Sequence, residues 1–373
     1  MDFALSRDQQ MLQSTAREFF LGRGLTQPAR RVMAGEAAVV GETWRQMAEV
    51  GFLGVGVPAA YGGAELGPLS LVPILEEAGR ALAVGPLPEA LGFAAPVLAA
   101  AGSESQRDRY LGGLASGGEC ITLALYEGDG DPCAGDVELA ADRVAGGYRL
   151  RGRKRLVPHA GEATTLLVLA RTTRDAPGRG LTLFAVDAGA AVVTPVAALD
   201  QSRPLYEVEF RETAAERVGP EGAGFPLFEL GLQTMASALV AMSVGGMQRC
   251  LEMSAEHAKT RVQFGQPIGR FQAIKHRIVD MWVDLETARS LSHYAAWALE
   301  EHAADRVTAG ADAKAFTGPA FVRCAAANIQ NHGGMGFTWE ADPHLFLKRA
   351  KAWEGYGGTA ETHLERVAAS LHW

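Results

Sequence analysis

The apolar pattern of the chain changes twice, from helical spacing to short strand-like runs and back to helical spacing. Up to residue 118 apolar residues recur at helical intervals, starting behind Ser6 and Gln9, whose spacing predicts a capping box. Residues 119–221 form short β-like runs separated by Gly, Asp and Pro. An order of helices, strands and helices differs from the alternation of α/β folds. The sequence therefore predicts an α+β protein.

Residues 222–373 are predicted to form a bundle of long helices. Leu232, Met235 and Leu239 recur at helical spacing in its first part. The helix expected within residues 271–302 carries apolar residues beyond one stripe, including Trp282, Val283 and Trp297. A second apolar face suits burial against another chain, so we expect an oligomer.

Charge and cysteine content exclude several classes of protein. The chain has 35 basic and 43 acidic residues, a formal net charge of -8, which disfavours nucleic acid as a partner. Its four cysteines lack the spacing of a metal site and fit reduced thiols; they are Cys120, Cys133, Cys250 and Cys324. Residues 1–13 do not have the pattern of a secretory signal, which predicts a cytoplasmic protein. The most apolar run, residues 238–246, is shorter than the roughly 20 residues that span a bilayer, so no membrane span is predicted.

Three segments have unusual and specific patterns. The first is WRQMAEVGFLGVGVPAAYGG at residues 44–63, and the second is RVQFGQPIGRFQ at residues 261–272, which interrupts a helical pattern with Gly and Pro. The third is the glycine-rich QNHGGMGFT at residues 330–338. Together, within this three-part organisation, the segments resemble the acyl-CoA dehydrogenase family, and the resemblance covers nearly the whole chain.

The resemblance implies a fold and a chemistry. The fold would have an N-terminal helical domain at residues 1–118, a β-barrel-like domain at 119–221 and a C-terminal four-helix bundle at 222–373. The activity would be FAD-linked α,β-dehydrogenation of an acyl-CoA thioester, as in β-oxidation of fatty acids or steroid side chains. An electron-transfer flavoprotein would accept the electrons. In this family one subunit completes the FAD site of its neighbour.

Residues 261–272 would form the first part of that shared site. The resemblance places Arg261 at the FAD pyrophosphate, Phe264 against the cofactor and Gln272 at the adenosine portion. An arginine fork matches phosphate oxygens well. Pro267 is expected in the first turn of the next helix, where its missing N–H is not needed.

The glycine-rich segment would form the second part. Gln330 would donate to the pyrophosphate region, while Gly333, Gly334 and Gly336 would let backbone N–H groups approach it. By the resemblance, both segments would serve the flavin of a partner subunit. Taken singly, each also fits an ordinary solvated helix end or turn.

The glutamate base of the family is missing from both places where members carry it. The usual position, before Gly-Thr near the C-terminus, is Gly357, and the alternative position on the first long helix of the last domain is Met235. Without a carboxylate to remove the α-proton, ordinary turnover is not expected. Glu354, Glu361 and Glu229 are candidate substitutes, although solvated surface acids would show the same pattern.

The β section also departs from the family. Leu156 and Pro158 stand where a Trp and a Thr would hold the isoalloxazine ring, and the acidic flavin loop has become LYEGDGDPCAGD at residues 125–136. His159 and His332 have no carboxylate at a recognisable spacing, so neither is predicted to be an acid or base.

This loss is one-sided, since the segments that would complete a neighbour's flavin are kept. It favours the non-base subunit of a heteromeric acyl-CoA dehydrogenase, paired with a homologous subunit in a heterotetramer like those acting on steroid side-chain CoA esters. Two alternatives are a self-sufficient homo-oligomer with a displaced base such as Glu354, and a flavin-free protein that binds acyl-CoA or a partner.

Overall fold

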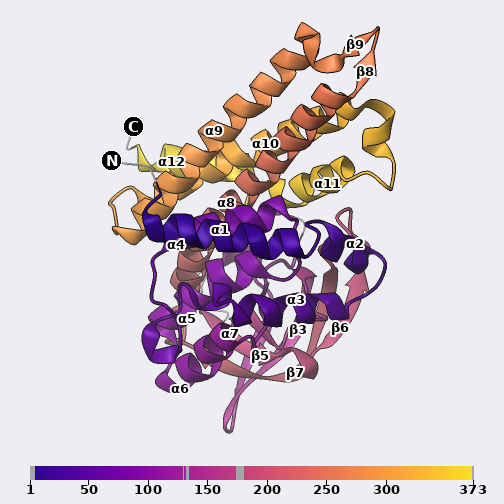
Figure 1. Ribbon diagram of the computed structural model, residues 1–373. Coiled ribbons are helices and arrows are strands. Elements are labelled where there is room, and N and C mark those ends of the chain that lie inside the picture. The colour runs from indigo at the N-terminus through magenta and orange to yellow at the C-terminus, as the bar shows by residue number, and fades with distance from the viewer. Residues whose placement is uncertain (1–4, 129, 132–133, 174–179, 372–373) are drawn as a thin grey trace. The chain divides into compact units, whose positions relative to one another are not determined.

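A computed structural model describes residues 5–128, 130–131, 134–173 and 180–371 (Figure 1). Its contacts divide the chain into two compact units that interleave in the sequence. The first unit consists of Met1–Gln27, Pro68–Ala83 and Ser237–Trp373, and the second of Pro28–Gly67 and Val84–Ala236. The domain bounds expected at residues 118 and 221 stay a prediction.

The first unit is helical. Its helices are α1 (Arg7–Gly22), α4 (Pro68–Arg80), most of α8 (Gly224–Thr260), α9 (Gln272–Glu300), α10 (Arg306–His332), η8 (Gly333–Phe337), α11 (Pro343–Glu354) and α12 (Ala360–Ser370). The capping box of Ser6 and Gln9 at the start of α1 is confirmed. Helices α4 and α8 touch so closely that a Cβ on Gly79 would lie 1.8 Å from the Met242 carbonyl oxygen. Glycine is therefore required where these two backbones meet.

Ion pairs tie the N-terminal helices of this unit to its later ones. Arg17 on α1 contacts Glu77 on α4 at 2.6 Å, and Arg80 on α4 contacts Glu252 on α8 at 2.7 Å. Glu77 is buried, so removing its arginine partner would leave a desolvated charge. These contacts explain why two N-terminal segments belong to the same unit as the C-terminal helices.

Helix α8 is the one described helix that is long and apolar enough to cross a membrane. Of its most apolar 18-residue window, 72% is buried inside the fold. Such burial is typical of a core helix, whose apolar residues are covered by protein on several sides. The apolar part of α8 extends beyond residues 238–246, and the burial of α8 inside the fold explains its additional apolar residues.

The second unit combines short helices with a β-barrel. The helices are α2 (Gln27–Met33), α3 (Ala38–Glu49), η1 (Phe52–Gly54), η2 (Ala59–Tyr61), η3 (Pro88–Ala94), α5 (Ala95–Ala101), α6 (Glu104–Gln106), η4 (Arg107–Leu111), α7 (Gly112–Ser116), η5 (Ala134–Asp136) and η6 (Ala188–Ala190). The strands are β1 (Ile121–Ala124), β2 (Ala140–Val144), β3 (Gly147–Pro158), β4 (Thr165–Arg171), β5 (Leu181–Asp187), β6 (Val192–Val196) and β7 (Leu205–Val218).

Five of these strands close into a ring. Strand β4 pairs with β2 and β5, β2 pairs with β3, and β7 pairs with both β3 and β5. Strand β1 adds to β4 in parallel, and β6 adds to β7. Buried side chains such as Leu150, Val168, Phe184 and Phe210 fill the interior. The predicted α+β architecture with a barrel-like β region is confirmed.

Candidate functional site

A two-residue turn carries Phe264 at the tip of a short hairpin. Strands β8 (Val262–Gln263) and β9 (Gln266–Pro267) pair antiparallel after α8, and Phe264 and Gly265 join them with φ angles of 51° and 75°. Two successive left-handed residues are typical of a type I′ turn, which Asn-Gly forms with less strain than Phe-Gly. The Phe264 side chain is 92% exposed. The chain thus holds an aromatic ring in solvent on a strained backbone.

Pro267 lies outside the helix in which the sequence analysis placed it. It belongs to β9 and precedes the 3-10 turn η7 (Ile268–Arg270), whereas α9 begins at Gln272 with Phe271 at its N-cap. The prediction of Pro267 in a first helical turn is wrong. A two-residue edge strand accepts proline because few of its N–H groups are needed for pairing. Gln272 itself is exposed at the first position of α9.

The backbone of Arg261 is fixed while its side chain is not. Its N–H donates to the His257 carbonyl at 2.9 Å, and its own carbonyl accepts from the N–H of Ile268 at 2.8 Å. The guanidinium is exposed and has no hydrogen-bond or ion-pair partner among the described residues. An arginine positioned by its backbone and open to solvent is suited to bind an anion from outside the chain.

The glycine-rich segment ends α10 with a sharp turn. Gly333 has a φ of 59°, and a Cβ on Gly336 would lie 2.7 Å from the Ile329 carbonyl oxygen, so both positions require glycine. A Cβ on Gly333 or Gly334 would meet no atom within 4 Å. Their backbone is therefore open to solvent, as is the side chain of Gln330.

The structure brings these two segments together at one end of the first unit. The rings of His257, near the end of α8, and His332, at the end of α10, stack with centroids 4.4 Å apart. Arg277 on α9 donates to Asn331 on α10 at 3.2 Å. Figure 1 shows the β8–β9 hairpin and the connection between α10 and α11 at the same end of these helices.

The two positions for a catalytic glutamate offer no acid. Met235 is fully buried in α8, and Gly357 is buried with a φ of 78° that any side chain would strain. Glu354 pairs with Lys351 at 2.6 Å, and their side chains are 35% and 47% exposed. Glu229 and Glu361 are exposed. Among the three candidate substitutes, Glu354 is thus engaged in a partly exposed ion pair.

A buried lysine caps the C-terminal end of the helix that precedes Gly357. The Lys314 ammonium, on α10, donates to the carbonyls of Trp353 at 2.9 Å and of Glu354 at 3.0 Å. Lys314 is 4% exposed. A cation at these last carbonyls stabilises the C-terminal end of α11. Sequence reasoning missed this residue because its partners lie about 40 positions away.

The β segment that would hold a flavin ring contains a bulge. The register of β3 against β7 shifts between Lys154 and Val157, and Leu156 in this bulge has a φ of 52° and is 40% exposed. Pro158 is buried and has no hydroxyl to donate. Leu156 supplies no aromatic ring, so the residues at these two positions do not replace the lost Trp and Thr.

The strand before the bulge is nevertheless anchored firmly. The fully buried Lys154 contacts Glu127 at 2.6 Å, and Glu127 also accepts from the backbone N–H groups of Glu138 and Leu139. Burial lowers the pKa of Lys154, and the attraction of Glu127 opposes this shift. The ion pair fixes the chain after β1 against β3. Asp129, Pro132 and Cys133 of the acid-rich loop lie outside the described residues.

His159 has a neighbouring carboxylate that the sequence analysis did not identify, and the prediction that it is neither an acid nor a base stays a prediction. Its Nδ1 lies 3.7 Å from Oε2 of Glu162, whose Oε1 accepts from the Tyr206 hydroxyl at 2.6 Å. Burial raises the pKa of Glu162, but the nearby His159 and the hydrogen bond from Tyr206 outweigh it and leave the pKa lowered. The spacing of three residues was the available signal. His159 is 2% exposed, which favours a structural role in the barrel.

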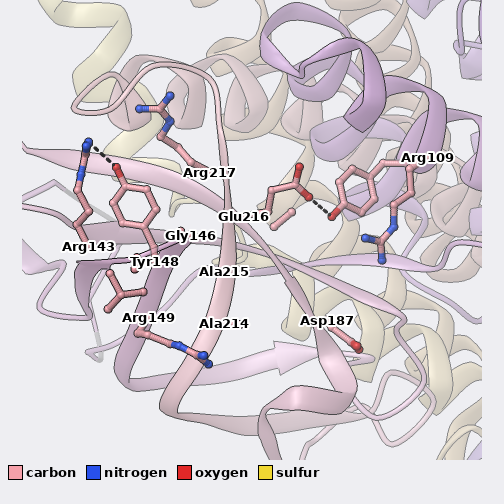
Figure 2. A pocket seen from close by; sticks show the side chains of 15 residues that line it. Arg109, Arg143, Gly146, Tyr148, Arg149, Asp187, Ala214, Ala215, Glu216 and Arg217 are labelled. Atoms are coloured by element: carbon pink, nitrogen blue, oxygen red, sulfur yellow. Dashed lines mark hydrogen bonds between the residues drawn. The ribbon is translucent and has the colours of Figure 1, made fainter.

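A shallow hollow of about 690 Å³ on the second unit is lined by several arginines (Figure 2). Arg143 pairs with Glu221, and Arg109 lies 3.5 Å from Glu119. Arg149 donates to a backbone carbonyl. Carboxylates therefore offset much of the positive charge, and no predicted cofactor residue lines this hollow.

Comparisons with known proteins agree with the resemblance. Residues 6–118 match the family model "Acyl-CoA dehydrogenase, N-terminal domain", and residues 222–372 match "Acyl-CoA dehydrogenase, C-terminal domain". The chain is 30% identical to the probable acyl-CoA dehydrogenase YngJ of Bacillus subtilis (strain 168), over 100% of both chains. The chain belongs to the acyl-CoA dehydrogenase family. Homologues named acyl-CoA dehydrogenase indicate an oxidoreductase that acts on the CH–CH group of acyl-CoA, and an FAD-bound structure of a homologue supports FAD as the cofactor.

Solved structures of family members share the fold closely. The structure "PigA with FAD and proline" superposes with a TM-score of 0.90 and 28% identity, covering 100% of this chain and 99% of that one. The Tcur3481-Tcur3483 steroid ACAD superposes with a TM-score of 0.86 and 31% identity, covering 97% and 96%. The acyl-CoA dehydrogenase fold is therefore established along the whole chain.

Proposed function

We propose that this chain is the non-base subunit of a heteromeric acyl-CoA dehydrogenase. It would complete the FAD site of a homologous subunit, and that subunit would carry the glutamate base. The assembly would catalyse α,β-dehydrogenation of an acyl-CoA thioester. An electron-transfer flavoprotein is the proposed acceptor, and β-oxidation of a fatty acid or steroid side chain is the proposed pathway.

The observation that carries the proposal is the exposure of Phe264 and Arg261 on a backbone that is itself well fixed. The Phe264 ring makes an edge-on contact with Phe271, centroids 6.1 Å apart, but stays exposed to solvent on a strained left-handed turn. The benefit of this exposure would come from a group that covers the ring. The open backbone at Gly333 and Gly334 lies at the same end of the bundle, so aromatic, cationic and N–H groups are available together.

These residues fit the outer part of an FAD molecule. Arg261 would hold the pyrophosphate, Phe264 would pack on the cofactor and Gln272 would bond the adenosine portion. Gln330 and the N–H groups of Gly333 and Gly334 would add donors near the phosphates. FAD, when bound, supplies the hydride acceptor. This chain would supply binding and orientation at the cofactor's adenosine end.

The same subunit lacks the groups for the reacting end. Met235 and Gly357 leave both family positions without a proton acceptor, and Leu156 and Pro158 offer neither a stacking ring nor a hydroxyl. A homodimer of such chains would have flavin sites without a base. Pairing with a base-bearing homologue would supply the missing base. The similarity to a steroid ACAD whose name contains two proteins, Tcur3481 and Tcur3483, supports such a pairing.

Two arginines in the same segment offer a matched test. In the flavin-containing assembly, Arg261→Ala should lose most of the bound FAD. Arg270→Ala, which removes another exposed arginine nine residues away, should retain it. Equal FAD content in both variants would contradict the proposed role of Arg261. An assembly that never contains FAD would favour the flavin-free alternative.

The self-sufficient alternative has its own test. If the chain alone dehydrogenates acyl-CoA and Glu354→Gln abolishes that turnover, Glu354 is a displaced base and the heteromeric proposal is wrong. If turnover by the chain alone survives the substitution, another group provides the base. The heteromeric proposal expects no turnover by the chain alone.

A further inference from the structure

The stacked imidazoles of His257 and His332 connect the two segments to which the proposed function assigns flavin binding. We propose that this stack is a proton-sensitive latch, in which the neutral His257 ring on His332 holds the hairpin after Arg261 beside the Gly333–Gly334 turn and protonation of His257 releases it. The latch rests on the proposed function for its consequence, because release would weaken binding of FAD at this end of the bundle. His257 and His332 would be positioning residues.

Each histidine is coupled directly to one flavin segment. The His257 carbonyl accepts the N–H of Arg261 at 2.9 Å, so a shift of the His257 backbone moves Arg261, which directly precedes the hairpin. His332 immediately precedes Gly333, and its Nδ1 contacts the Asn328 carbonyl at 2.8 Å. Since a carbonyl only accepts, Nδ1 carries the proton in this contact.

The surrounding charges favour a neutral His257 ring. Burial lowers the pKa of His257 below its ordinary value of 6.5, and the charges of His332 and Arg261 lower it further. From α9, Arg277 donates to Asn331 beside His332 and adds another arginine to this end of the bundle. No described carboxylate contributes to the pKa shift of His257. A proton on His257 therefore meets repulsion from its cationic neighbours.

The sign of the pH effect follows from the lowered pKa. The unfolded or released segment binds a proton near pH 6.5, while the latched segment resists it to lower pH. The latch is thus fully stable above about pH 6.5 and loses stability as the pH falls through the lowered pKa. Both rings are partly accessible to solvent, so protons can reach them.

The first test measures FAD dissociation from the flavin-containing assembly of the full chain between pH 8 and pH 5.5. In the wild type, the dissociation constant should rise severalfold as the pH falls below 6.5, with a slope of at most about tenfold per pH unit for one linked proton. His257→Phe keeps an aromatic ring in the stack but cannot be protonated, so this rise should be less than about twofold. His276→Phe, at an exposed histidine on α9, should behave as the wild type does.

The proposal is overturned if wild-type FAD binding does not change with pH, or if His257→Phe keeps the wild-type pH dependence. A second test uses no flavin: the ring resonances of labelled histidines are titrated by NMR in the full chain alone. His257 should titrate below pH 6.5 and should move toward that value in His332→Phe. A wild-type His257 that titrates at or above 6.5 would overturn the latch. Failure to bind FAD at any pH would count against the proposed function, and the NMR titration would then decide the latch alone.

Discussion

Replacing Phe264 with asparagine should stabilise the chain while weakening the assembly that it forms. Phe264 occupies the first central position of a two-residue hairpin turn with a φ of 51°, and its ring is 92% exposed. Asparagine adopts left-handed φ angles with less strain because its short side chain bonds locally. The substitution therefore relieves strain and removes from the isolated chain an exposed edge-on contact with the Phe271 ring.

The expected magnitudes have opposite signs in the two states. A left-handed conformation costs a residue such as Phe roughly 1 kcal/mol more than it costs Asn, so Phe264→Asn should stabilise the chain by about that amount. For a chain of this length this corresponds to a rise of about 1 °C in Tm. Covering a phenylalanine ring contributes about 2 kcal/mol, so FAD binding in the assembly should weaken about thirtyfold.

Two measurements on the same variant decide the outcome. Thermal unfolding of the isolated chain gives the first magnitude, and FAD dissociation from the assembly gives the second. Leu199→Asn, which changes another exposed apolar residue in the second unit, should alter neither by a measurable amount. A Phe264→Asn variant that unfolds more easily than wild type would refute the assignment of strain. Unchanged FAD binding would refute the proposed contact between the ring and the cofactor.

Three further predictions concern stability. Arg203→Leu should destabilise the second unit by about 3–5 kcal/mol in denaturant unfolding, because the fully buried Glu89, 2.6 Å away, would lose its cation. The double variant with Glu89→Leu should recover most of this stability, and no recovery would contradict the explanation. Gly358→Ala should lower Tm by several degrees, since the φ of Gly358 is 119° and the new Cβ would lie 2.9 Å from a buried histidine nitrogen. An unchanged Tm would contradict this requirement for glycine. Burial raises the pKa of Glu252, but hydrogen bonds from Arg80 and Gln248 outweigh it and leave the pKa lowered. The stability that this group contributes is therefore present above pH 4.5 and is lost as the pH falls below it. Glu252→Gln should reduce this loss of stability in acid, and a pH profile identical to that of the wild type would contradict the contribution of Glu252.

Much of the fold could be predicted from local patterns. The capping box of Ser6 and Gln9 depends on residues three positions apart, and strands such as β4 and β5 consist of continuous buried apolar runs. Strand β2 (Ala140–Val144) was not predicted, because AADRV has few β-branched residues and its burial is mostly partial or absent. The interleaved units were not predicted either, since they depend on contacts such as Arg80 with Glu252, which are distant in sequence.

The candidate site was predictable in composition but not in geometry. The motif identified Arg261 and Phe264, but the hairpin that contains Phe264 was not predicted from the sequence. Phe-Gly lacks the usual turn signal, and Pro267 also suits a helix start. The stack of His257 on His332 joins residues 75 positions apart, so only the folded chain shows it. The pairing of Lys314 with the end of α11 was invisible for the same reason.

The most direct test of the central claim is the visible absorption spectrum of the purified protein, alone and after co-expression with a base-bearing homologue. The proposed heteromeric function predicts a colourless protein when the chain is purified alone and a yellow, FAD-containing complex when the homologue is present. A chain that is yellow by itself, and whose flavin bleaches on anaerobic addition of acyl-CoA esters, would contradict it. Such a chain would contain a complete site and a base of its own.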